Sequence, residues 1–157
     1  MTDFEQLYEH HARDVYRFAL YLSGDRAVAE DITSETFVRV WTAPARVELA
    51  TVRAYLLTIA RNLYLHGLRR QRRRTEMPEA LPDPAPGPHE EAAGREEMEL
   101  VMAALRQLPE VDRAALLMRA EDGLSYAEIA VALGVSEAAA KVKVHRARLK
   151  LACLRRT

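Results

Sequence analysis

The sequence has a single cysteine, Cys153, among its 157 residues. One thiol cannot close an internal disulfide, and it cannot provide a cysteine set for zinc. The five histidines are not spaced like known metal ligands such as H-E-x-x-H. We therefore expect neither a disulfide framework nor a bound metal or cofactor.

Long apolar runs are also missing. The longest, such as residues 114–118, are far too short to cross a bilayer. The N-terminus has no basic start followed by an apolar stretch, so no export signal is expected. The six glycines form no phosphate-binding loop, and no nucleophile is paired with a base. These absences predict a soluble, cytoplasmic protein without intrinsic catalysis.

The formal net charge is zero, with 23 basic and 23 acidic residues, but the charges are sorted along the chain. Residues 1–45 carry a net charge of −4, residues 46–75 carry +7, residues 76–99 carry −7 and residues 100–157 carry +4. Five arginines fall within positions 69–74 alone. Two basic segments separated by an acidic one are compatible with two contacts to one polyanion, such as a nucleic acid.

Apolar residues recur at helical spacing, and no strand-like alternation is longer than four residues. We expect a first helix that ends at Gly24 and a second that Asp25 caps and that ends before Pro44. A third helix should start at Val52 and end in the arginine block, where positive charge suits the helix dipole. Residues 44–51 lack a period and are expected to form a loop.

Five of the seven prolines lie between residues 78 and 88, among acids and alanines. Neither a helix nor a core strand tolerates that density of proline. We therefore predict an all-α protein with two small helical domains, residues 1–74 and 95–157, joined by a flexible, Pro-rich, acidic linker at 75–94.

The C-terminal segment 124–151 reads LSYAEIAVALGVSEAAAKVKVHRARLKL. Ser125 and Glu128 have the spacing of a capping box at a helix start, and Gly134 is expected to end that helix. Ser136 then caps a second helix after a short turn. This arrangement is typical of a helix-turn-helix, whose second helix enters the DNA major groove.

The second helix of this motif is strongly basic, which favours duplex DNA as its ligand. The alternative is a basic amphipathic helix on a generic helical domain. The residues expected to contact duplex DNA are Ser125, Tyr126, Lys141, Lys143, His145, Arg146 and Arg148.

Residues 29–41 read AEDITSETFVRVW, and residues 53–70 read RAYLLTIARNLYLHGLRR. Together with the C-terminal motif, these segments resemble the extracytoplasmic-function class of bacterial sigma factors, the small two-domain initiation subunits of RNA polymerase. The resemblance covers nearly the whole chain in family order. It implies a factor that binds core polymerase, directs it to specific promoters and helps to melt the minus-ten element, under control of an anti-sigma factor.

The resemblance also implies roles for individual residues. The helix at 29–41 would dock on the clamp coiled coil of the polymerase through Asp31, Ser34, Glu35 and Arg39. The loop and third helix would bind the minus-ten element as single-stranded DNA, with one base entering a protein pocket. The residues implied there are Arg46, Arg53, Arg61, Asn62, Arg69 and Arg70. The C-terminal helix would read the duplex minus-thirty-five element, and the polymerase flap is a further implied partner.

Departures from the usual family residues occur at Ser34, Val52, Tyr55, His66 and 138–140. Phe37, Trp41 and Tyr55 are expected in the core rather than stacked on bases, because aromatic side chains dominate small cores. Tyr64 could serve either role.

Other functions stay open at this point. The arginine block could be a solvated helix end or a nonspecific polyanion patch. The chain could be a stand-alone helix-turn-helix regulator of duplex operators, or a sigma-like decoy that binds an anti-sigma factor and never reads promoters. An enzyme acting on nucleic acid is disfavoured, because no convincing cluster of metal-binding carboxylates is present.

Overall fold

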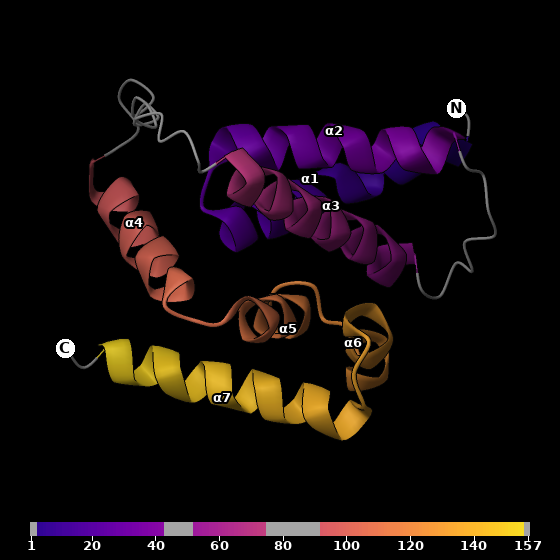
Figure 1. Ribbon diagram of the computed structural model, residues 1–157. Helices are drawn as coiled ribbons and strands as arrows, with labels where there is room; N and C mark the ends of the chain where they lie inside the picture. Colours follow the sequence, from indigo (N-terminus) through magenta and orange to yellow (C-terminus); the bar gives the residue numbers. More distant parts are fainter. Residues whose placement is uncertain (1–2, 43–51, 75–91, 156–157) are drawn as a thin grey trace.

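The computed structural model describes residues 3–42, 52–74 and 92–155, and over these residues the chain forms seven α-helices and no strand. The predicted all-α class is therefore confirmed. None of the described helices is both long enough and apolar enough to cross a membrane. The helices are α1 (Asp3–Ser23), α2 (Arg26–Thr42), α3 (Val52–Arg74), α4 (Ala92–Arg106), α5 (Glu110–Ala120), α6 (Tyr126–Leu133) and α7 (Glu137–Arg155) (Figure 1).

The first three helices pack together around large apolar side chains. Phe18 and Leu22 of α1, Phe37 of α2, and Leu56 and Leu57 of α3 are all nearly fully buried. Each side chain of this size stabilises the fold by roughly 1.5–3 kcal/mol when it leaves water. These residues form the centre of the N-terminal bundle, α1 to α3.

The turn between α1 and α2 follows the local chemistry that the sequence predicts. Gly24 has a φ of 72°, in the left-handed region that favours glycine. Asp25 Oδ1 accepts hydrogen bonds from the backbone N–H groups of Ala27 and Val28, at 2.9 and 3.2 Å. Asp25 therefore caps α2, as predicted.

The last three helices form a C-terminal bundle, α5 to α7, with smaller side chains at its centre. Met118, Ile129 and Val144 are fully buried, and Ala140 and Ala147 lie between them on the inner face of α7. Because the alanine side chain is short, the helix backbones can approach closely, and α7 lies close to α5 and α6 (Figure 1).

The helix-turn-helix has the bounds that the sequence predicts. Ser125 Oγ accepts a hydrogen bond from the Glu128 N–H at 3.1 Å, and the Glu128 carboxylate accepts one from the Ser125 N–H at 2.9 Å. Gly134, with a φ of 69°, ends α6. Ser136 Oγ then accepts from the Ala139 N–H at 3.1 Å and caps α7. The predicted capping box is confirmed.

The two bundles pack against each other, which helical periodicity does not predict. Helix α1 lies against α5, and α3 lies against α5 and α6 (Figure 1). The pattern of apolar residues indicates which side of a helix is buried, but not which neighbour covers its polar side. The loop expected at 44–51 lies outside the described residues. The linker expected at 75–94 lies outside them as far as residue 91. The predicted domain boundaries therefore stay predictions.

Helix α4 lies to the side of both bundles and touches α1, α5 and α7 (Figure 1). Leu105, near its C-terminal end, is 3% exposed and anchors it, and Leu108 is buried in the following turn. Leu100 and Val101 remain 71% and 50% exposed. The C-terminal turn of α4 is thus held more firmly than its middle.

One expected core residue is not in the core. Phe37 is buried as predicted, and Tyr55 is partly buried against the core. Trp41 is 62% exposed, so its predicted burial was wrong. It follows Val40, the last buried residue of α2, and among the described residues it lies beside the first turn of α1. Its indole packs edge-on against Phe4, with ring centroids 4.7 Å apart.

Candidate polymerase and nucleic-acid interfaces

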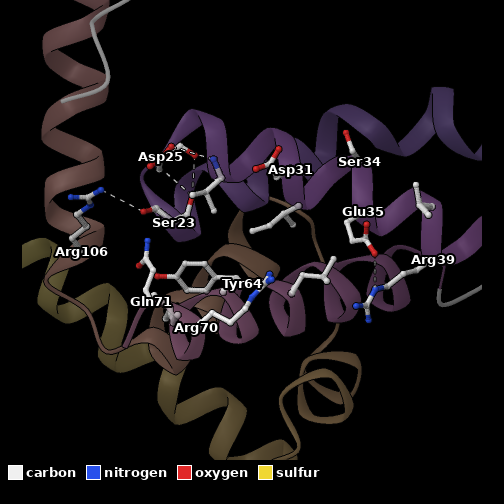
Figure 2. Close-up of a pocket in the computed structure, with 16 residues that line it drawn as sticks. Ser23, Asp25, Asp31, Ser34, Glu35, Arg39, Tyr64, Arg70, Gln71 and Arg106 are labelled. Carbon is white, nitrogen blue, oxygen red and sulfur yellow. Dashed lines mark hydrogen bonds and ion pairs between the residues drawn. The ribbon is translucent and has the colours of Figure 1, made fainter. Parts of the chain in front are cut away.

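The four residues predicted to bind polymerase lie on one exposed face of α2. Asp31, Ser34, Glu35 and Arg39 recur every three or four positions, which places them above one another on the helix surface. They form one wall of a cavity of about 870 Å³ (Figure 2). Val38, which the sequence analysis did not select, lies on the same wall and is 50% exposed. Val38 thus adds an exposed apolar side chain to this polar row.

Glu35 and Arg39 form an ion pair on this wall, with 3.4 Å between the carboxylate and guanidinium. Their side chains are 50% and 53% exposed, so each remains hydrated. Exposed pairs of this kind contribute little to stability. Either residue can therefore exchange this contact for one with a partner at small cost.

The opposite wall of the cavity comes from the C-terminal half of α3, including Tyr64, Arg70 and Gln71 (Figure 2). Arg106 of α4 closes one end, where its guanidinium donates to the carbonyl oxygens of Ser23 and Gly24 at 3.4 and 3.2 Å. A Cβ atom on Gly24 would lie 2.5 Å from this guanidinium. The positive φ of Gly24 favours glycine in the turn, whereas the Arg106 guanidinium lies at the end of a flexible side chain that can move away from an added Cβ.

The fold exposes some of the residues predicted to contact the minus-ten element and buries or pairs others. Asn62, Arg69 and Arg70 are exposed along α3. Arg61 is only 8% exposed, and its guanidinium donates to both carboxylate oxygens of Glu110 in α5, at 2.9 and 2.6 Å. The fifth predicted helical contact, Arg53, is described next, and the position of Arg46 lies outside the described residues.

Arg53 contacts both bundles although its side chain is 45% exposed. Its guanidinium lies 3.5 Å from the Asp14 carboxylate of α1 and donates to the backbone carbonyl of Asp122 at 3.1 Å. Nearby, Arg17 and Glu121 form an ion pair at 3.4 Å that joins the two bundles, as the Arg61–Glu110 pair does. The bundles are therefore joined by charged groups as well as by apolar packing.

A buried carboxylic acid lies within this charged cluster. Asp122 is 3% exposed, and within the described part of the chain neither oxygen of its carboxyl group has a hydrogen-bond partner. Burial, reinforced by the negative charge of Asp14, raises the pKa of Asp122 to about 7. Burial and the neighbouring Arg53 lower the pKa of His11 on the same side of α1. Protonated Asp122 and neutral His11 are thus the forms that suit the packed bundles.

Helix α7 has a buried face and a basic outer face. Ala140, Val144 and Ala147 face the core, while Lys143 is half-buried at the edge. The outer surface combines charge with two apolar side chains, because Val142 and Leu149 are 57% and 55% exposed. The exposed residues that share this surface are Lys141, Val142, His145, Arg148 and Leu149.

Arg146, another predicted DNA contact, is paired within the protein although its side chain is 57% exposed. Its guanidinium donates to both oxygens of Asp112 at 2.8 and 2.9 Å, and Asp112 is 2% exposed. This hydrogen bonding raises the pKa of Arg146 above its ordinary value. A guanidinium and a carboxylate matched in this way fix geometry as well as charge. Arg146 therefore ties α7 to α5.

The two predicted contacts at the start of α6 also have structural roles. The Ser125 hydroxyl is used in the capping box. The Tyr126 ring is partly buried and lies beneath two cations, with Arg119 at 4.3 Å and Lys141 at 5.7 Å from its centroid. Contacts of this kind restrain a flexible cation on the ring face. Tyr126 thus orients Lys141 at the outer surface of α7.

Sequence comparisons match both halves of the chain. Residues 7–74 match Sigma-70 region 2, and residues 98–151 match Sigma-70 region 4. The ECF RNA polymerase sigma factor SigL of Mycobacterium tuberculosis is 35% identical over 146 residues, which cover 90% of this chain and 82% of SigL. The ECF RNA polymerase sigma factor SigE of Mycolicibacterium smegmatis is 38% identical over 96% of this chain, which spans only 61% of that longer relative.

Solved structures show the same arrangement of helices. The sigma factor RpoE of Bartonella quintana, in complex with the anti-sigma factor NepR, superposes with a TM-score of 0.81 at 24% identity, over 100% of this chain and 99% of RpoE. CnrH, in complex with the cytosolic domain of CnrY, gives a TM-score of 0.71 at 27% identity, over 96% of this chain and 86% of CnrH. The fold described above is therefore shared across both halves.

Proposed function

Because this chain belongs to the extracytoplasmic-function sigma factors of bacterial RNA polymerase, we propose that it is a dissociable promoter-specificity subunit. It binds core polymerase, directs it to specific promoters and helps to melt the minus-ten element, while the polymerase supplies the catalysis. The observation that carries the proposal is one chain with three different polar surfaces: the α2 wall, the basic side of α3 and the outer face of α7.

Polymerase docking is assigned to the α2 wall. Asp31, Ser34, Glu35 and Arg39 are all accessible, and Val38 adds an apolar contact at the centre of their row. A mixed polar and apolar patch of this kind suits the side of a coiled coil, which carries charged residues next to its apolar seam. The C-terminal bundle is assigned to the polymerase flap.

Minus-ten recognition is assigned to α3 and the segment before it. Asn62 would read an unpaired base, and Arg69 and Arg70 are exposed for phosphate contacts. Arg46, Arg53 and Arg61 complete the proposed set. A row of arginines along one helix follows a single-stranded backbone, while base contacts give the sequence preference.

Minus-thirty-five recognition is assigned to the outer face of α7. Lys141, His145 and Arg148 can contact bases or phosphates, and Val142 can contact the methyl group of a thymine. Lys143 can reach a phosphate from the edge of the helix. Ser125 and Tyr126 would approach the DNA backbone at the start of α6. Arg146 acts mainly by holding α7 in place through Asp112.

Two alternatives differ in the surfaces that they require. A stand-alone regulator of duplex operators needs α7 but has no use for the α2 wall. A decoy that binds only proteins has no use for the exposed arginines of α3. The presence of all three surfaces favours the initiation factor.

We also propose that this chain acts in the cytoplasm, where core polymerase is found, and that an anti-sigma factor controls it. Support comes from CnrH, a structural relative whose structure is a complex with the cytosolic domain of CnrY. The cavity between α2 and α3, next to Arg106, is a candidate surface for such a partner.

The test is open-complex formation by bacterial core polymerase on a library of randomised promoters, with permanganate reporting unpaired thymines. We expect melting only when both the protein and the core are present. Reversing the charge in Asp31→Arg should weaken core binding, whereas Glu9→Arg on the exposed surface of α1 should not. Core binding without melting would favour the decoy. Duplex binding that needs no core would favour the stand-alone regulator.

A further inference from the structure

Arg146 is paired with a carboxylate and yet open to solvent. Its Nε and Nη2 atoms donate to Oδ2 and Oδ1 of Asp112, at 2.8 and 2.9 Å. The Asp112 side chain is 2% exposed, whereas that of Arg146 is 57% exposed. The Arg61–Glu110 pair differs, because both of its side chains are largely buried. The Arg146–Asp112 pair therefore has a buried end on α5 and an open end on the surface of α7.

The hydrogen bonds to Asp112 use only one edge of the Arg146 guanidinium. A guanidinium has five N–H donors in a planar fork. The Nε hydrogen and one Nη2 hydrogen point at the carboxylate. The second edge, formed by Nη1 and the other Nη2 hydrogen, can bind two further acceptors at once. In the major groove of DNA, O6 and N7 of guanine are two acceptors with this spacing.

Arg146 lies on the face of α7 that is assigned above to duplex DNA. It follows Val142 by four positions and precedes Leu149 by three, which places the three side chains along one side of the helix. Val142 and Leu149 are 57% and 55% exposed, and His145 is exposed beside them. The open edge of the guanidinium is therefore on the side of α7 that would meet the bases.

We propose that Asp112 is a specificity-determining positioning residue for the minus-thirty-five element: it holds one edge of the Arg146 guanidinium so that the other edge reads a guanine in the major groove. Arg146 then serves both to hold α7 and to contact DNA, and Asp112 acts through it without touching DNA. This inference deepens the proposed function and rests on it, because it concerns the duplex-binding surface of α7.

The pair is expected to persist when DNA binds. Asp112 lies in the first turn of α5, where the helix dipole favours a negative charge. Withdrawal of Arg146 would leave this buried carboxylate without a counter-charge, which is costly. DNA therefore meets a guanidinium whose orientation is already fixed. The rotamer freedom of the side chain is lost on folding, so less is lost on binding.

A fixed orientation favours a base over a phosphate as the acceptor. A phosphate contact requires mainly positive charge, whereas base readout depends on the exact placement of two acceptors. Lys141 shows the contrast on the same helix. Its ammonium is a point charge on a flexible stem and lies over the Tyr126 ring at 5.7 Å from the centroid. Lys141 thus suits a phosphate, and Arg146 suits a guanine.

The experiment measures base preference with the full-length protein bound to bacterial core polymerase. Promoter duplexes are randomised across the minus-thirty-five element, and sequencing of the bound fraction gives the relative affinity for each base at each position. Arg146→Lys is compared with the wild type first. Lysine keeps the charge but has no fork, so the position whose preference it loses is the one that Arg146 reads. We expect roughly a tenfold preference for guanine there in the wild type.

Asp112→Asn tests the positioning role directly. Asparagine has nearly the same shape, but its amide offers one acceptor oxygen in place of two. Most of the preference for guanine should disappear at the position read by Arg146, while the preferences at other positions stay unchanged. Val144→Ala removes buried apolar contacts on the inner face of α7 and is the control for a general loss of stability. It should weaken binding to every sequence and keep the guanine preference.

A measurement on the wild-type protein keeps the proposal testable if Asp112→Asn is poorly folded. The Nε–H group of Arg146 should exchange slowly with solvent in nuclear magnetic resonance spectra, because it donates to a buried carboxylate. Its signal is identified by its loss in Arg146→Lys. Rapid exchange of this proton would overturn the proposal.

The base preferences can also overturn it. Asp112 has only a structural role if Asp112→Asn keeps the full guanine preference or weakens all sequences alike, as Val144→Ala does. Arg146 contacts the DNA backbone if Arg146→Lys changes no preference and Arg146→Gln lowers the salt dependence by about one phosphate contact. Either result excludes a guanine read through Asp112.

The results separate this inference from the proposed function. If base preference does not depend on Asp112 while the wild-type protein melts promoters with core, the positioning role fails and the initiation function stands. The opposite case is also distinguishable. If no promoter is melted with core, but the full-length protein alone selects duplexes with a guanine preference that depends on Asp112, the initiation function fails and the positioning role stands.

Discussion

The cores of the N-terminal and C-terminal bundles contain different types of residue. The core of α1 to α3 contains Phe18, Phe37 and several leucines. The core of α5 to α7 is rich in alanine and also encloses charge, because Asp112 and Arg113 are 2% and 7% exposed. The stability of the first bundle depends on the apolar area that its large side chains bury. The stability of the second bundle depends more on close helix approach, helix caps and the hydrogen bonds of Asp112 and Arg113.

This difference matches the work proposed for each bundle. The surfaces of α2 and α3 are free to carry polar residues, because large side chains hold the helices from inside. The short helix α6 has only eight residues, so its two ends must be stabilised locally. The following predictions test this contrast.

The largest effect is expected from the N-terminal core. Phe18 is 1% exposed at the centre of α1. Phe18→Ala should lower the free energy of unfolding by about 3–5 kcal/mol, because it removes apolar contacts and leaves a cavity. Chemical denaturation monitored by circular dichroism measures this loss. Tyr8→Ala, at a residue 47% exposed on the same helix, is the control. An equal loss of unfolding free energy in the two variants would show that the stability of this bundle does not depend on its large buried side chains.

The next effect concerns pH and the junction of the bundles. Burial, with Asp14 nearby, raises the pKa of Asp122 from 3.8 to about 7, so the folded state binds its proton more tightly than the unfolded state. This contribution to stability is full below pH 3.8 and is lost as the pH rises to about 7. The shift corresponds to at most about 4 kcal/mol. Denaturation midpoints between these two pH values measure it.

Asp122→Asn should remove this part of the pH dependence and stabilise the protein above pH 7. Glu121→Gln changes the neighbouring carboxylate, which is 41% exposed, and should leave the dependence in place. If the free energy of unfolding depends on pH in the same way in the wild type and in Asp122→Asn, the pKa of Asp122 is not raised in the folded protein.

A smaller loss is expected from the buried arginine of α5. Arg113 donates to the carbonyl oxygens of Leu105 and Leu108 at 3.4 and 3.2 Å and to Tyr64. Arg113→Met keeps much of the side-chain volume but leaves buried acceptors without donors, at a cost of about 1–3 kcal/mol. Arg13→Met on the exposed side of α1 is the control and should be nearly neutral. Urea denaturation of both variants would show whether buried polar groups stabilise this bundle.

The smallest effect is expected at the helix cap. Ser125→Ala removes the acceptor for the Glu128 N–H and should cost about 1 kcal/mol. Ser34→Ala, at an exposed position in the middle of α2, should change stability by less than about 0.5 kcal/mol. Thermal denaturation of the two variants makes the comparison. A neutral Ser125→Ala would show that tertiary packing alone holds α6.

Local features of the fold were predictable because their causes are local. Asp25 caps α2 and Ser125 caps α6 through atoms two or three residues away. Gly134 ends α6 because it can adopt a positive φ. Asp31 and Glu35 are exposed because the apolar residues of α2 lie on the other side of the same helix.

The missed features depend on neighbours that are distant in sequence. Arg61 carries the same local signal as exposed Arg69, yet it is buried because Glu110 lies opposite, 49 residues later. Trp41 was predicted in the core because it is aromatic, but it lies near the end of α2, beside Phe4 in the first turn of α1. Val38 was overlooked although it lies three positions after Glu35 and four after Ser34, a spacing that places it on the same exposed face of α2.

The sequence by itself determined the helices, their caps, the order of the two bundles and the charge that each segment carries. Helix periodicity, capping and composition act over a few residues, so they can be read along the chain. Only the tertiary structure decided which arginines form internal ion pairs, because Arg61–Glu110 and Arg146–Asp112 form only when packing brings distant groups within about 3 Å.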